Sequence, residues 1–219
     1  TSMNFTILEI SIVTFLLAIS GAIAQFPIGK FSDLYDRRKV IVFSTFGAAI
    51  FSILAILVSR QMYLPGGLAT SKTWFYIFFI LFSFCSLPMF SLILAHTNDY
   101  ISKDKFVAAG AGLQFAFGLG AMSGPFLCSI FMDLVGSNGF FVFLFFFHSI
   151  IGFFGIYRMK VRKTVDNPDS QFVAMPQTIT PAGIELNPTT EHIEEPYSDK
   201  VKEILERKGV KYKKEEIKT

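Results

Sequence analysis

The sequence predicts an all-α integral membrane protein with five transmembrane helices and a mostly disordered cytoplasmic tail. Three observations predict this class: 52% of the residues are hydrophobic, 27 of the 219 are Phe, and apolar runs of helix length follow one another. A hydrocarbon layer of about 30 Å requires roughly 20 apolar residues at a rise of about 1.5 Å each. Five runs reach this length, over residues 5–31, 40–59, 74–96, 106–131 and 139–157.

Charged residues are confined to the ends of these five runs. None of the runs carries Asp, Glu, Lys or Arg at mid-depth, where a single charge costs about 2.5 to 3.5 kcal/mol. The acidic residues nearby all lie at segment ends: Glu9, Asp33, Asp36, Asp99, Asp104 and Asp133. A large soluble bundle of buried apolar helices does not account for five such runs in succession.

Basic residues in the short loops predict the orientation, because Lys and Arg are retained on the cytoplasmic side. One side carries Lys30, Arg37, Arg38, Lys39, Lys103, Lys105, Arg158, Lys160, Arg162 and Lys163, and the other carries only Arg60 and Lys72. The N-terminus is therefore predicted outside and the C-terminus in the cytoplasm. The high Phe, Ile and Lys content is typical of an AT-rich genome and favours a bacterial inner membrane. Thr1 in first position and an odd helix count suggest a fragment.

The chain divides into a transmembrane domain, residues 1–163, and a cytoplasmic tail, residues 164–219. Five of the nine prolines lie between Pro168 and Pro196, where no apolar helical period occurs, so this part reads as an extended linker. A short helix over residues 199–208 is possible, with Ser198 as its cap; it is either a solvated helix or one that docks onto the cytoplasmic face of the membrane domain or onto a partner. The tail carries eleven acidic and eight basic side chains, which argues against binding nucleic acid or anionic lipid.

The loop between the first two runs carries a recognisable motif. It reads Gly-Lys-Phe-Ser-Asp-Leu-Tyr-Asp-Arg-Arg over residues 29–38. It resembles the loop signature of the major facilitator superfamily, G-x-x-x-D-[RK]-x-G-[RK]-[RK], and is closest to the degenerate copy between the eighth and ninth helices. Gly29, Asp33, Arg37 and Arg38 match. Leu34 replaces a basic residue and Asp36 replaces the second Gly, a position where Asp tolerates a left-handed turn.

The resemblance implies a gating role for this loop. A carboxylate can accept hydrogen bonds from the N–H groups of a helix terminus, and in the family the corresponding Asp meets a helix of the opposite half. Asp33 is then the candidate latch, a contact that holds the two halves together on the cytoplasmic side. The family's Arg pairs with an acidic residue at a nearby helix end, and Asp99 is the match for Arg37. Alternatively, Arg37, Arg38 and Lys39 only set the topology.

The fourth run contains Gly120-x-x-x-Gly124-Pro125, which is similar to the glycine-proline pattern of the fifth and eleventh helices in antiporter branches of this family. Small residues four positions apart let helix backbones approach closely, and Pro125 bends the helix. A plain packing face is the alternative interpretation.

Together these motifs resemble helices eight to twelve of a twelve-helix transporter, most similar to the YcaD-like bacterial branch, over about residues 1–163. The resemblance implies alternating access between two halves, so the expected partners are the lipid bilayer, a small-molecule solute and an N-terminal half supplied in cis or by a separate gene. Midplane depth selects Thr14, Ser86 and Gln114 as substrate-cavity candidates. An interhelical hydrogen bond is an equally open role for Gln114, and His148 reads as a packed or locally bonded residue.

Two other functions remain to be weighed. The chain could be a non-transporting remnant or a split-gene product that requires a separate N-terminal half. An intramembrane enzyme is disfavoured, because the sequence has no paired His ligands, no Ser/His or Asp/Asp pair at mid-depth and no phosphate-binding loop. We therefore expect no catalytic residues, metal site or cofactor. Any proton-coupling carboxylate of the complete transporter is expected in the half that this chain does not supply.

Overall fold

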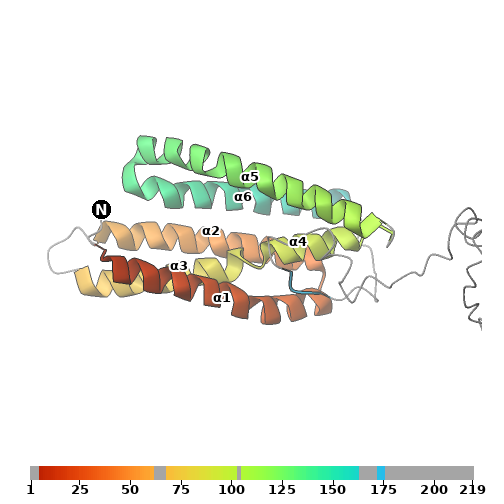
Figure 1. The fold of residues 1–219 in the computed structure, drawn as a ribbon, viewed down its shortest axis with the longest axis horizontal. Helices are drawn as coiled ribbons and strands as arrows, with labels where there is room; N and C mark the ends of the chain where they lie inside the picture. The colour runs from red at the N-terminus through yellow and green to blue at the C-terminus, as the bar shows by residue number, and fades with distance from the viewer. Residues whose placement is uncertain (1–4, 62–67, 103–104, 163–171, 176–219) are drawn as a thin grey trace, which may run out of the picture.

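The protein is described here by a computed structural model, which covers residues 5–61, 68–102, 105–162 and 172–175. Its helices are α1 (Ile7–Leu34), α2 (Arg37–Gln61), α3 (Leu68–Ser86), α4 (Met89–Asn98), α5 (Phe106–Val135) and α6 (Gly139–Val161), with the short 3-10 helix η2 (Gly136–Asn138) before α6. The helices lie side by side along the long axis of the molecule (Figure 1). We call the two ends of this bundle the Asp33 end and the Glu9 end. The tail helix expected over residues 199–208 lies outside the described residues.

Four stretches of the described chain are long and apolar enough to cross a membrane: Ile7–Leu34, Arg37–Ser59, Lys72–Asn98 and Phe106–Val161. The last of these has 56 residues and contains α5 and α6, which fold back on each other at η2. Phe131 of α5 packs against Phe143 and Phe147 of α6, so the two helices are antiparallel neighbours. The all-helical membrane architecture agrees with the sequence, and the count of five crossings stays a prediction.

One expected helix is interrupted. The run over residues 74–96 was expected to form a single helix, but α3 ends at Ser86 and α4 begins at Met89, with a turn at Leu87 and Pro88. Proline has no backbone N–H to donate to the preceding turn, and its ring crowds the carbonyl four residues earlier. The helix resumes at once, because the Leu92 N–H donates to the Pro88 carbonyl at 3.0 Å.

Local sequence explains where the helices begin and turn. The Thr6 side chain accepts from the Glu9 N–H while the Glu9 carboxylate accepts from the Thr6 N–H, a capping box that begins α1. Between α5 and α6 the chain reverses at Gly136, which has φ of 77°, a conformation open to glycine but strained for most side chains. The remaining bounds lie within a few residues of the expected runs.

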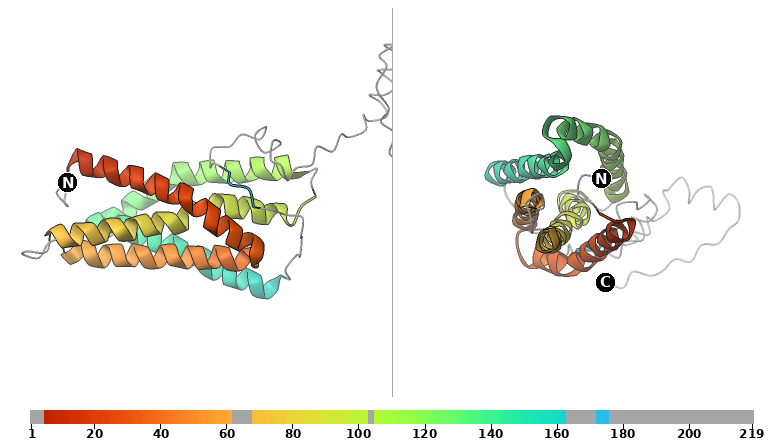
Figure 2. Two further views of the ribbon diagram at one scale, coloured as in Figure 1. Left: turned by 90° about the horizontal axis from the view of Figure 1, so that it is seen from below. Right: turned by 90° about the vertical axis from the view of Figure 1, so that its left-hand side faces the viewer.

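The bundle is built around α2, which packs most extensively against α3 and α6. Seen along the long axis, α5 and α6 lie on one side of the molecule and α1 lies across from them (Figure 2). Reciprocal hydrogen bonds join α1 to α3: Ser20 donates to the Ile80 carbonyl at 3.0 Å, and Ser83 donates to the Leu17 carbonyl at 2.8 Å. Small hydroxyl residues of this kind let membrane helices approach closely.

Candidate functional site

The loop motif forms the candidate site at the Asp33 end, where the last turn of α1, the first turn of α2 and the end of α4 meet. Arg37 lies at its centre. Its Nη2 donates to Asp33 Oδ1 at 2.8 Å and its Nη1 donates to Asp99 Oδ1 at 2.9 Å. The Arg37 side chain is only 7% exposed, so both bonds are shielded from water. One guanidinium therefore ties three helices together.

Asp36 and Arg38 form a second ion pair beside the first. Arg38 Nε and Nη2 donate to the two carboxylate oxygens of Asp36 at 3.1 and 2.8 Å, a bidentate geometry. Asp36 Oδ1 also accepts from the Arg38 backbone N–H at 3.0 Å. Asp36 thus caps the start of α2, a role that its position immediately before the helix would have indicated. The motif comparison treated it only as a replacement for glycine.

Arg38 also connects this site to the end of α6. Its Nη1 donates to the Arg162 carbonyl at 2.7 Å, and the Arg162 guanidinium lies 4.2 Å from the centre of the Tyr100 ring. Tyr100 follows α4, so the ends of α2, α4 and α6 are joined by charged groups. The sequence interpretation assigned Arg162 only to the basic loop that sets topology.

Asp33 has a further partner from the tail. The Phe172 N–H donates to Asp33 Oδ1 at 2.8 Å, and the Phe172 ring lies against Gly29. A Cβ added at Gly29 would overlap this ring, so the motif glycine is required for the contact. The Asp33 side chain remains 33% exposed. Nothing in the loop motif itself pointed to the tail as a partner.

The glycine-proline motif lies on an open face of α5. A Cβ added at Gly120 or at Gly124 meets no described atom within 4 Å, and Pro125 is exposed. No helix of the described chain packs against these two glycines. The close helix contact that the motif predicts is therefore not made within the described residues.

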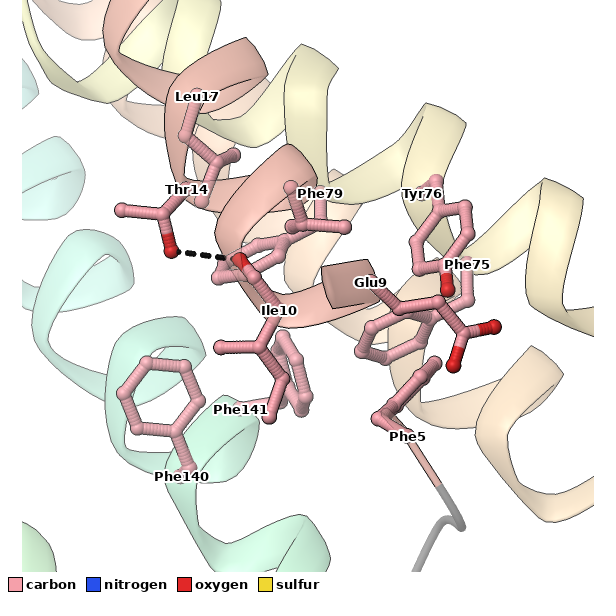
Figure 3. Close-up of a pocket in the computed structure, with 11 residues that line it drawn as sticks. Phe5, Glu9, Ile10, Thr14, Leu17, Phe75, Tyr76, Phe79, Phe140 and Phe141 are labelled. Atoms are coloured by element: carbon pink, nitrogen blue, oxygen red, sulfur yellow. Dashed lines mark hydrogen bonds between the residues drawn. The ribbon is translucent and has the colours of Figure 1, made fainter. Parts of the chain in front are cut away.

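Thr14 lines a pocket of about 310 Å³ between α1, α3 and α6, and Figure 3 shows this pocket. Its walls are mainly aromatic, with rings from Phe5, Phe75, Phe79, Phe140 and Phe141. The Thr14 hydroxyl donates to the Ile10 carbonyl of its own helix at 2.9 Å (Figure 3). The pocket offers a largely apolar surface with the hydroxyls of Thr14 and Tyr76, and Glu9 also lines it.

The other two cavity candidates lie in different environments. The Ser86 hydroxyl lies 3.0 Å from Nε2 of His148, so it bonds α6 instead of opening into a cavity. His148 Nδ1 lies 2.8 Å from the Leu144 carbonyl, which can only accept, so Nδ1 carries a proton. By contrast, Gln114 Oε1 on α5 is inaccessible and has no hydrogen-bond donor among the described residues.

The opposite end of the bundle holds an ion pair that the sequence interpretation missed. Lys72 Nζ donates to Glu9 Oε1 at 2.9 Å and lies 5.1 Å from the centre of the Phe5 ring. The Thr-x-x-Glu capping signature at residues 6–9 could have marked Glu9 as a structural residue. Within the described residues, no group of three or more His, Cys, Asp or Glu side chains is arranged to hold a metal ion.

Comparison with known proteins places the sequence of this chain in a family. The sequence model of the Major Facilitator Superfamily matches residues 1–204. An uncharacterized MFS-type transporter of Yersinia enterocolitica is 27% identical over 160 residues, which cover 73% of this chain and 37% of that protein. Uncharacterized MFS-type transporters of Yersinia pestis and Yersinia pseudotuberculosis are 25% identical over the same shares. The chain thus spans a little over a third of these relatives. No solved structure matches it.

Proposed function

The chain belongs to the Major Facilitator Superfamily, and from this premise we propose that it forms the C-terminal part of a secondary transporter. In this proposal α1 to α6 supply helices eight to twelve, α3 and α4 together forming the tenth. The complete transporter moves a small solute by alternating access, as two halves rock about a site near the midplane. Membership of the family supports the assignment as part of a solute transporter. The geometry of the site supports the proposed helix numbering and mechanism.

The observation that carries the proposal is the double ion pair of Arg37 with Asp33 and Asp99. Charge-assisted bonds at 2.8 and 2.9 Å, shielded from water, hold the ends of α1, α2 and α4 in one arrangement. A rocking mechanism requires such a unit, because the helices of one half must move together. Asp33 lies at the edge of this unit, where a helix N-terminus from the other half could reach the carboxylate once Phe172 is displaced.

Two surfaces of the described chain are exposed, and the small-residue surface supports contact with an N-terminal half. Large apolar side chains are open along α1, including Phe15, Ile23 and Phe26 at 64%, 58% and 79% exposure. On α5, the glycine face at Gly120 and Gly124 is also open. Small-residue faces favour close helix contact in membranes, where apolar surface alone can face lipid. We assign the α5 glycine face to contact with the N-terminal half.

Hydrogen bonding distinguishes among Thr14, Ser86 and Gln114, the three candidates for residues that face the substrate. Ser86 bonds another helix through His148, whereas Thr14 bonds only within its own helix and lines a pocket, which supports Thr14 and Gln114 as the cavity residues. The Gln114 amide can donate and accept, and its oxygen lacks a donor among the described residues. A buried polar atom without a partner is unfavourable, so a polar solute would relieve it. We propose a small polar solute as the substrate.

The proposal extends to the orientation of the chain in the membrane. We propose that the Asp33 end is cytoplasmic and that the protein lies in a bacterial inner membrane, as the basic loop residues favour. One alternative keeps the same fold. Because the chain spans 37% of its Yersinia enterocolitica relative, the remaining helices could come from a separate gene, or the chain could be a non-transporting remnant.

Reconstitution distinguishes these functions. Residues 1–219 are placed in liposomes alone, or after co-expression with the polypeptide encoded upstream of Thr1. Ligands for the assembled protein are first found by thermal shift with a panel of polar solutes, and uptake of each radiolabelled hit is then measured. Saturable uptake only by the assembled pair supports the proposal. Saturable uptake by residues 1–219 alone, with oligomers excluded, would show that the missing-half argument is wrong.

A further inference from the structure

Residues 172–175 lie across α1 and α4 at the Asp33 end, where Figure 1 draws them as a short blue trace beside α4. Backbone hydrogen bonds hold both ends of this segment. The Phe172 N–H donates to Asp33 Oδ1 at 2.8 Å, and Ser91 Oγ both accepts from the Met175 N–H at 3.1 Å and donates to the Met175 carbonyl at 2.9 Å. Side chains of α1 and α4 thus form hydrogen bonds to the backbone of the segment at two residues, Phe172 and Met175.

The side chains of the segment divide into an inward and an outward set. Met175 is 7% exposed, and Phe172 packs against the buried cluster of Ala24, Ile28 and Leu92. Ala174 between them is exposed. Ser91, which holds Met175, is itself only 2% exposed, so its hydroxyl is directed at the segment in an enclosed place. The segment is therefore held by two apolar side chains, Phe172 and Met175, and by hydrogen bonds to Asp33 and Ser91.

We propose that the α1–α4 surface is a binding site for an extended peptide, that its occupant is residues 172–175 of this chain, and that this occupant excludes the N-terminal half from Asp33. The last part rests on the proposed function, which assigns Asp33 to the contact between halves. The segment is therefore an internal competitor of the latch. Its release is required before the two halves can close at the cytoplasmic end.

The segment and the N-terminal half compete for the space over Gly29 as well as for hydrogen bonds to Asp33. Gly29 has no side chain, and the Phe172 ring lies where a Cβ would be. A helix end that approached Asp33 along the motif would meet this ring first. The donor that the tail supplies to Asp33 Oδ1 and the cover over Gly29 both belong to Phe172, so displacing Phe172 removes both and leaves Arg37 as the partner of that oxygen. Loss of the segment exposes the carboxylate and the glycine together.

The segment 172–175 can occupy its site with only a few contacts, because it is covalently linked to α6. Nine residues, 163–171, connect the end of α6 to Phe172. A fully extended chain spans at most about 3.3 to 3.6 Å per residue, which keeps the segment within roughly 35 Å of Arg162. Short linkers give effective concentrations in the millimolar range, so weak binding suffices to keep the site occupied. An N-terminal half, also held nearby in the transporter, can still displace it.

Hydrogen exchange tests the binding site on residues 1–219 in lipid nanodiscs. The amides of Phe172 and Met175 should exchange at least about tenfold more slowly than those of the same segment as a free peptide. Phe172→Ala should remove most of the protection at Met175, and the matched control Ala174→Ser, at the exposed position, should leave it intact. Neither residue is part of a helix, so the two changes leave the sequence of the helices intact. Free-peptide exchange rates in the unmodified chain would overturn the proposal.

A second pair of variants locates the receptor. Ser91→Ala should lower the protection of Met175 about as much as Phe172→Ala does. Ser123→Ala is the control, because that hydroxyl donates to the Leu119 carbonyl within α5. Equal protection in Ser91→Ala and the unmodified chain would place the segment elsewhere and overturn the site.

Cross-linking tests the competition separately. Ser91→Cys and Met175→Cys are combined in a chain whose Cys85 and Cys128 are replaced by Ser, and oxidation closes the pair. The N-terminal polypeptide, expressed separately and tagged, should bind the oxidised chain at least about tenfold more weakly than the reduced one. Equal binding in both states overturns the competition while the proposed function stands. No binding in either state overturns both the proposed assembly and the competition, and the exchange experiment still decides the peptide site.

Discussion

Arg37 at the start of α2 donates to Asp99 at the end of α4 across a sequence separation of 62 residues. The same guanidinium donates to Asp33 four residues earlier, so Arg37 balances one local and one distant carboxylate. With 7% and 14% of the two side chains exposed, this is a shielded pair and not a surface contact. Shielded pairs are costly to break from one side, because the remaining charge loses its partner.

The pair should therefore dominate stability at the Asp33 end. Arg37→Ala should destabilise the protein by about 3 to 5 kcal/mol, and Asp99→Ala should cost less, because Arg37 keeps Asp33. A double-mutant cycle should give a coupling energy of about 0.5 to 3 kcal/mol, measured by SDS unfolding in mixed micelles. Arg158→Ala at the exposed end of α6 is the control. Strict additivity of Arg37→Ala and Asp99→Ala would tell against the pair.

Asp33 tests the latch in the complete transporter. Asp33→Asn keeps an oxygen that can accept but removes the charge, so acceptance from a helix N-terminus should weaken by about 0.3 to 2 kcal/mol. Uptake should fall by up to roughly 30-fold, given that about 1.4 kcal/mol is tenfold. Membrane insertion, followed by expression level and protease protection, should not change. Unchanged uptake at equal expression would remove Asp33 from the mechanism.

The proposed orientation is tested without reference to transport. A reporter that is active only in the cytoplasm, fused after Lys163, should be active, because the basic residues are retained on that side. The same reporter inserted near Gly67 should be silent, and an enzyme active only outside the cytoplasm should give the opposite pattern at both sites. Activity of the cytoplasmic reporter at Gly67 would reverse the orientation.

Ser86 and Gln114 should separate structure from transport. Ser86→Ala removes the bond to His148 and should destabilise the protein by only about 0.6 kcal/mol, the average found for such bonds in membranes. It should leave the apparent affinity for the solute unchanged. Gln114→Leu removes the amide proposed to face the solute and should raise KM at least about tenfold. An affinity loss in Ser86→Ala with none in Gln114→Leu would reassign the cavity.

The open face of α5 gives a matched pair of glycine substitutions. Gly120→Leu should be tolerated by residues 1–219 alone, since a Cβ there meets no described atom within 4 Å, but it should block co-purification with the N-terminal half. Gly152→Leu should destabilise the chain itself, because its Cβ would lie 2.8 Å from the Phe46 ring. Overpacking of this kind typically costs about 1 to 3 kcal/mol. Normal assembly of the Gly120→Leu variant would exclude the glycine face from the interface.

Much of the fold could be predicted from the sequence, because lipid forces the helices to be long, apolar and uncharged. Uncharged runs located α1, α2, α5 and α6 to within a few residues. The break at Pro88 was missed because hydropathy is blind to a missing backbone donor, although the proline itself was visible. Arg37 and Asp99 could be paired only through the family motif, since periodicity within one helix does not report distant contacts.

Other parts of the site lay beyond such reasoning. The Phe172 ring fits beside Gly29 because glycine has no side chain there. The sequence of the tail gives no sign of this space, so the contact could not be predicted. Likewise, the bond from Ser86 to His148 depends on which faces of α3 and α6 meet. Both helices are apolar on nearly every side, so the sequence does not indicate those faces. The capping role of Asp36 was accessible from its position alone and was overlooked because the motif drew attention to the missing glycine.

The three-residue connection between α5 and α6 has a consequence for biogenesis. A turn of Gly136, Ser137 and Asn138 is too short to let α5 settle in the bilayer while α6 waits outside it. We therefore expect the two helices to enter the membrane together, as a hairpin. The turn carries no charged side chain, so moving it across the membrane is inexpensive. We expect α5 to pair with α6 before the two helices pack on α2.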